Sequence, residues 1–110
     1  MTEKEFIGDY EIQETSYPRV KIVNDSLADS WVWKYAAIGN DIQRHFADYT
    51  VYISGGSYRS YDMIVDVDID SKMIRVDCYL PLHMDCEATT DWAIGHIRSV
   101  LESHKEEAAA

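Results

Sequence analysis

The stretch Tyr61-Asp62-Met63-Ile64-Val65-Asp66-Val67-Asp68-Ile69-Asp70 alternates between two sets of side chains. Successive side chains of an extended strand point to opposite faces of a sheet. One face of this strand can line a core, because it carries Met63, Val65, Val67 and Ile69. The other face is mostly acidic and carries Asp62, Ile64, Asp66, Asp68 and Asp70. The stretch therefore predicts a strand with one buried face and one acidic face that is open to solvent.

Two further strands are predicted beside this one. Residues 49–54 alternate and end at a glycine pair, which breaks the strand. Residues 73–80 also alternate and follow a short turn at 70–72. Three strands with short connections predict an antiparallel meander with one covered face, in which 61–70 is the middle strand. The open face of this meander would also display Tyr52, Arg75, Asp77 and Tyr79.

Helices are predicted on either side of the strands, over about 27–46 and about 88–104. The first has an apolar stripe at steps of three and four, formed by Trp31, Tyr35, Ile38, Ile42 and Phe46. An alternating strand over Ser30–Ala36 is an alternative for its first part. The second helix has a stripe formed by Ala93, Ile94, Ile97, Val100 and Leu101. Both stripes can pack on the apolar sheet face, which predicts an α+β two-layer sandwich.

The 110 residues are interpreted as one domain, residues 1–110. The α-β-β-β-α core is expected over 25–105 and a frayed tail over 106–110. Residues 1–24 form an N-terminal extension, in which 6–12 and 19–23 can pair as an additional hairpin.

The composition is strongly acidic, with 20 acidic against ten basic residues and a net charge of −10. Such a chain repels phosphate, which argues against direct nucleic-acid binding and favours a protein partner with a basic surface. The alternative is that the charge serves solubility alone. No apolar run is long enough to span a membrane and no signal-type segment follows the N-terminus, so a cytoplasmic location is expected. The oligomeric state is open, a homodimer included.

The acidic face of 61–70 is the first candidate binding site. Alternate strand residues lie about 6.6 to 6.8 Å apart, comparable with the through-space spacing of successive phosphates. A carboxylate row with this spacing can imitate nucleic acid. Aromatic groups would add contact area. The alternative is a solvated face on which Arg75 compensates part of the charge. The candidate partner-binding residues are Asp62, Asp66, Asp68, Asp70, Asp77, Tyr52, Tyr79 and Trp33.

Metal binding by the same residues is disfavoured. Asp66-x-Asp68-x-Asp70 resembles the start of an EF-hand loop, but Ser71 stands where that loop needs glycine. Its flanks read as strands, in which the carboxylates would stand in a row instead of converging on one ion. A zinc set of Cys78, His83, Cys86 and His96 matches no standard spacing. We therefore expect no metal and no cofactor, and we expect Cys78 to pack as a small apolar residue.

Catalysis is also disfavoured, because no nucleophile, P-loop or metalloprotease motif is present. The four histidines, His45, His83, His96 and His104, are scattered along the chain. The prediction is a protein that is not an enzyme, with a small metal-dependent or hydrolytic enzyme as the third alternative.

The helix, three strands, helix order resembles two protein groups. Tyr49-Thr50-Val51 and Ser54-Gly55 are similar to the first strand and turn of an acidic phage inhibitor, one of the anti-CRISPR proteins that block a CRISPR nuclease. Some of these use carboxylates to occupy a site meant for DNA. Leu80-Pro81-Leu82, followed by a helix with Ile94, is similar to the strand-to-helix passage of type III secretion chaperone-like proteins, including the YbjN group. The first resemblance implies an inhibitor or nucleic-acid mimic. The second implies an adaptor that binds through apolar surfaces.

Overall fold

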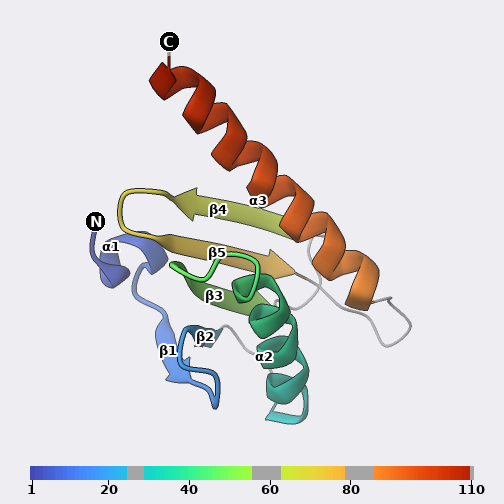
Figure 1. Cartoon of the computed structure of the whole chain (residues 1–110). Coiled ribbons are helices and arrows are strands. Elements are labelled where there is room, and N and C mark those ends of the chain that lie inside the picture. The colour runs from blue at the N-terminus through green and yellow to red at the C-terminus, as the bar shows by residue number, and fades with distance from the viewer. Residues whose placement is uncertain (25–28, 56–62, 79–85, 110) are drawn as a thin grey trace.

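The computed structural model describes residues 1–24, 29–55, 63–78 and 86–109 (Figure 1). Three helices and five strands follow one another along these residues. The order is α1 (Glu3–Ile7), β1 (Glu11–Glu14), β2 (Val20–Asn24), α2 (Asp29–Gln43), β3 (Thr50–Gly55), β4 (Met63–Asp68), β5 (Met73–Cys78) and α3 (Cys86–Ala109). A hairpin forms near the N-terminus as β1 and β2, but its first strand covers 11–14, and residues 6 and 7 of the predicted strand 6–12 belong to α1. A helix, not a strand, spans 30–36.

The five strands form one mixed sheet in the order β1-β2-β3-β5-β4. β1 pairs antiparallel with β2, and β4 pairs antiparallel with β5. β3 pairs parallel with β2 on one side and with β5 on the other. The connection from β2 to β3 includes α2, as parallel neighbours require a crossover. The α+β architecture predicted from the sequence is confirmed.

The predicted meander is wrong, because β3 and β4 do not pair. The chain leaves β3, forms β4 at the far edge and returns as β5 between them. β5 is therefore an interior strand and β4 is an edge strand. β3 carries the pattern expected of a strand covered on both faces, since five of its six residues are buried.

The main core lies between the sheet and the helices α2 and α3. Inward-facing residues of β2, β3 and β5 meet the α2 stripe there, and Val65 and Val67 of β4 pack against its margin. The side chain of Trp31 lies outside the described residues. Fully buried members include Val20, Ile22, Ile42, Val51, Ile53, Ile74, Val76 and Ile97. Two strand residues in this core, Val20 and Ile22, belong to the segment that the sequence assigned to an extension.

Two glycines let α2 lie close to the sheet. A Cβ atom on Gly39 would stand 2.7 Å from Cγ1 of Val20 and 3.3 Å from Cγ2 of Ile53. A Cβ atom on Gly55 would overlap the ring of Tyr35, whose hydroxyl donates to the carbonyl of Cys78 at 3.3 Å. The helix backbone therefore approaches the central strands more closely than any larger residue at these positions would permit.

A smaller core lies on the opposite face of the sheet, where α1 covers part of it. Ile7 packs there with Val23, Tyr52 and Met73, and Phe6 and Ile12 border them. α1 begins with a capping box, in which Thr2 and Glu5 each accept a hydrogen bond from the other's backbone N–H. This cover is the second correction to the predicted sheet, whose outer face was expected to be open throughout.

The helix α3 runs to Ala109, beyond the predicted end at His104 and through most of the tail expected to fray. At 1.5 Å per residue its 24 residues extend about 36 Å. Its C-terminal half projects past the sheet (Figure 1), and residues 102–108 are exposed. Among the described residues, no helix is long and apolar enough to cross a membrane.

Candidate functional site

The acidic strand lies at the edge of the sheet as β4, and its side chains remain accessible. Ile64 is 40% exposed and Asp66 is also exposed, while Val65 and Val67 are half-buried against the helix-side core. The predicted alternation of faces is thus present over the described part of the strand. No described side chain of β4 is buried, whereas five of six in the neighbouring β5 are.

Asp66 has no ion pair or hydrogen bond to its side chain within the described residues. Its cross-strand neighbour is Arg75, the residue expected to compensate it. Arg75 instead donates from Nη1 to the carbonyl oxygen of Ile7 at 3.3 Å, and its guanidinium carbon lies 5.6 Å from the ring centroid of Tyr10. The arginine thus contacts the N-terminal segment, and the Asp66 carboxylate faces solvent.

Asp68 and Asp70 differ from Asp66 in their surroundings. Asp68 is half-buried, and its Oδ1 accepts a hydrogen bond from the backbone N–H of Ser71 at 3.3 Å. This bond helps to shape the turn between β4 and β5, in which Lys72 adopts a left-handed backbone conformation with φ of 56°. Asp70 lies in the turn and is exposed. Asp68 therefore has a structural role besides its place in the acidic row.

Tyr52 and Asp77 were expected on the open face, and both are buried, at 3% and 6% exposure. Tyr52 lies under α1 and donates its hydroxyl to Oε2 of Glu3 at 2.7 Å. Burial, followed by the neighbouring Glu3 carboxylate, raises the pKa of Tyr52. Asp77 lies on the interior strand β5, beside Ser54 of β3. The predicted outer face is therefore accessible mainly at the β4 side.

Glu3 fastens α1 to the sheet through two partners. Its Oε2 accepts hydrogen bonds from Tyr52 and from Nζ of Lys21, the latter at 2.8 Å. The bond from Lys21, and next that from Tyr52, lowers the pKa of Glu3. The bond to Glu3 raises the pKa of Lys21, which also lies 3.6 Å from a carboxylate oxygen of Glu14. No sequence motif predicted these contacts, because Lys21 and Tyr52 lie 18 and 49 positions from Glu3 along the chain.

Of the remaining predicted binding residues, only Trp33 lies within the described part of the chain. Asp62 and Tyr79 lie outside the described residues. Trp33 is 71% exposed, but it lies on α2, on the helix-covered side of the sheet. Among the described residues of the predicted set, the exposed ones therefore fall into an acidic group at β4 and the turn after it, and a separate aromatic position at Trp33.

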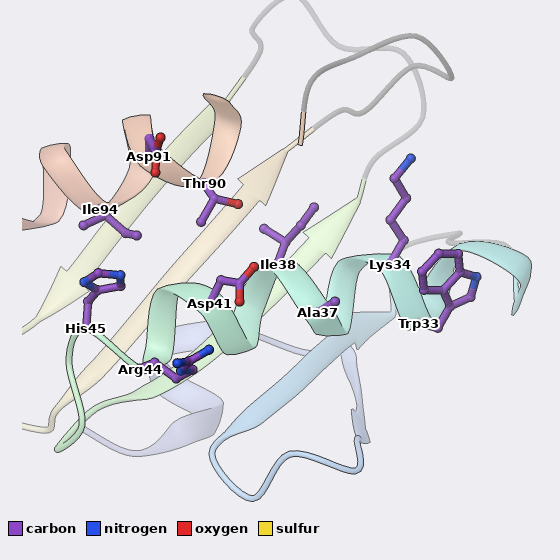
Figure 2. A pocket seen from close by; sticks show the side chains of 10 residues that line it. All are labelled: Trp33, Lys34, Ala37, Ile38, Asp41, Arg44, His45, Thr90, Asp91 and Ile94. Carbon is purple, nitrogen blue, oxygen red and sulfur yellow. The ribbon is translucent and has the colours of Figure 1, made fainter. Parts of the chain in front are cut away.

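Trp33 stands at one end of a groove between α2 and α3, with a volume of about 730 Å³ (Figure 2). Ala37 and Ile38 of α2 and Ile94 of α3 line it with apolar side chains. Its other lining residues are mostly charged or polar: Lys34, Asp41, Arg44, His45, Thr90 and Asp91. The groove has the size of a ligand pocket, but it is lined by charges of both signs.

A hydrogen bond links α3 to His45, which lines the groove away from Trp33. Nη2 of Arg98 on α3 lies 3.0 Å from Nδ1 of His45, just after α2. Because a guanidinium only donates, His45 accepts through Nδ1 and carries its proton on Nε2 when neutral. The sequence contained a signal for this flank, since Lys34, Asp41 and His45 recur at helical spacing beside the apolar stripe. That signal went unused because polar helix flanks are commonly solvated.

In the part of the chain that the structure describes, no three His, Cys, Asp or Glu side chains lie together so as to hold a metal ion. Cys78 is buried at 1% exposure and packs in the main core, as predicted.

No family model matches the chain, and the searches for a similar characterised protein or solved structure returned no match either.

Proposed function

We propose that this chain is a non-enzymatic binding module whose acidic β4 face engages a basic surface of a partner protein. The observation that supports it best is the position of Asp66. Its carboxylate is exposed on an edge strand, next to exposed Ile64, and the nearest cross-strand cation contacts α1 and Tyr10 instead. An unpaired charge beside an exposed apolar group is typical of a contact surface.

The charge of the whole chain supports the same partner. A net charge of −10 attracts a basic surface over a distance and accelerates encounter with it. Asp66 and Asp68 are alternate residues of one strand, about 6.6 to 6.8 Å apart, which suits contact with cations that otherwise hold phosphates. An inhibitor or nucleic-acid mimic, as the resemblance to anti-CRISPR proteins implies, is the form of this function that we favour.

The test compares two double variants with the same change in charge. Asp66→Asn with Asp70→Asn removes charge from β4 and from the turn that follows it, and is called the β4 variant. Glu102→Gln with Glu106→Gln removes the same charge from the projecting end of α3. A partner is first captured from the native host and identified by mass spectrometry, and its affinity is then measured for all three proteins. We expect the β4 variant to bind at least about tenfold more weakly and the α3 variant to bind nearly as well as the parent. Equal losses, or binding insensitive to raised salt, would contradict the proposal.

A second candidate is an adaptor that binds through the groove between α2 and α3. Exposed Trp33 favours it, because tryptophan is enriched among residues that dominate binding energy. The charged lining of the groove fits an apolar ligand poorly, and for this reason we place it second. Trp33→Ala would abolish binding by this route and leave binding by β4 unchanged.

A further inference from the structure

We propose that the partner segment is an extended basic strand that adds to the free edge of β4. This inference rests on the proposed function and specifies its geometry. In this geometry the partner binds by pairing its backbone with β4, and not only by contact between two folded surfaces. The geometry also predicts a recognisable sequence pattern in the partner.

The edge of β4 is regular and unpaired in the described structure. β4 pairs with β5 over six consecutive residue pairs, from Met63↔Cys78 to Asp68↔Met73, and no strand follows β4 in the sheet. In an antiparallel pair, alternate residues direct their N–H and C=O groups toward the partner, and the others direct theirs away. Half of the β4 backbone groups are therefore available to a further strand, in a register without an interruption.

The other edge of the sheet is a poorer template. β1 spans only four residues, and Glu14 at its end interacts with Lys21 of β2. β4 is longer, and the Asp66 carboxylate has no such partner among the described residues. An added strand would thus gain both more backbone hydrogen bonds and an uncompensated charge at β4.

The charge of β4 selects the occupant. A second copy of the chain would place like carboxylates opposite one another, which is destabilising across strands. Lysine or arginine in an added strand would instead lie about 4.5 to 5.5 Å from Asp66 and Asp68, measured between Cβ atoms. Nucleic acid has no strand backbone and would be repelled. The occupant that fits is an extended protein segment with alternating basic residues.

The other face of β4 indicates which residues should lie between the basic residues of the added strand. Val65 and Val67 are half-buried and point to the side of the sheet that carries α3. An added strand would place its intervening side chains beside these valines. Apolar or β-branched residues there would extend the margin of the main core. The predicted pattern is therefore basic–apolar–basic–apolar, with the basic residues on the Asp66 face.

The experiment uses the full chain and synthetic peptides of about ten residues that alternate Lys with Val. Two further peptides carry N-methyl groups on one or the other alternate set of amides, which removes backbone donors and keeps the charge. A fourth peptide has the same composition in blocks. Binding to the parent chain and to Asp66→Asn is followed by fluorescence anisotropy.

Strand addition predicts that one methylated peptide binds at least about tenfold more weakly while the other binds like the unmodified one, because only one set faces β4. Equal binding by both methylated peptides would overturn strand addition. The proposed function would survive that result if Asp66→Asn still weakened binding. Binding insensitive to Asp66→Asn would contradict both. Failure of the unmodified peptide to bind would overturn strand addition alone, since a folded basic surface could still engage β4.

Discussion

β4 and β5 are adjacent strands of six residues with similar alternating sequences, yet their environments differ. In β5, five of six side chains are buried, including Asp77. In β4, every described side chain is at least partly exposed. The outward residues illustrate the contrast, since Met73 of β5 lies under α1 while its neighbour Asp68 of β4 remains half-exposed. Position in the sheet, not alternation, separates the buried strand β5 from the accessible edge strand β4.

The largest expected effect tests this contrast with one substitution in both strands. Val65 and Val76 are cross-strand partners, and both point toward the main core. Val76→Ala removes two fully buried methyl groups and should lower the free energy of unfolding by about 2 to 3 kcal/mol. Val65→Ala should cost about 1 kcal/mol, because that side chain is only half-buried. Urea denaturation measures both, and equal losses would remove the distinction between the strands.

The next effect concerns the helix cover over the central strands. Gly39→Ala inserts a methyl group against Val20 and Ile53, which should outweigh the gain in helix propensity and destabilise by about 1 to 2 kcal/mol. Gly95→Ala is the matched control on α3, where a Cβ atom meets nothing within 4 Å. This variant should gain about 0.5 to 1 kcal/mol. Thermal unfolding of the pair gives the comparison, and a stabilising Gly39→Ala would show that α2 packs more loosely than described.

The packing of α1 on the opposite face of the sheet should contribute less to the free energy of unfolding. Tyr52→Phe removes the hydrogen bond to Glu3 and should cost about 1 kcal/mol near neutral pH. Glu3 has a lowered pKa, so the contribution of its charged form is complete above its ordinary value of 4.5 and is lost as pH falls through the folded-state value. The difference between Tyr52→Phe and the parent should therefore shrink in acid. A difference that stays constant from pH 6 to pH 3 would contradict this assignment.

The smallest effect on stability is expected at Asp66. Asp66→Asn should change the free energy of unfolding by less than about 0.5 kcal/mol, because the exposed carboxylate has no partner among the described residues. Asp68→Asn should cost somewhat more, since it weakens the bond to Ser71. Chemical denaturation tests the order, and a large loss at Asp66 would mean that its charge supports the fold.

Most of the correct predictions came from the spacing of apolar side chains along the helices and strands. It was sufficient for the α2 stripe, for the inward position of Ile74, Val76 and Cys78, and for the two faces of β4. The spacing of apolar residues could not show that β5 pairs with β3, because strands in parallel and antiparallel pairs can alternate in the same way. The short connections then favoured an antiparallel meander. The spacing also could not place α1 over Tyr52, because five residues without a clear stripe gave no sign of where they would pack.

The candidate site was predictable to the same extent. The exposed position of Asp66 followed from local alternation. The burial of Tyr52 and Asp77 results from packing between distant segments, so the sequence could not predict it. The groove between α2 and α3 could not be predicted for the same reason.

Amide hydrogen exchange, with and without the alternating Lys and Val peptide, tests the central claim most directly. In the free chain, the β4 amides that point away from β5 should exchange much faster than those of β5. Peptide should slow exchange at alternate residues of β4 and leave α2 and α3 unchanged. Protection confined to the groove, around Ala37 and Asp41, with none at β4 would contradict the account.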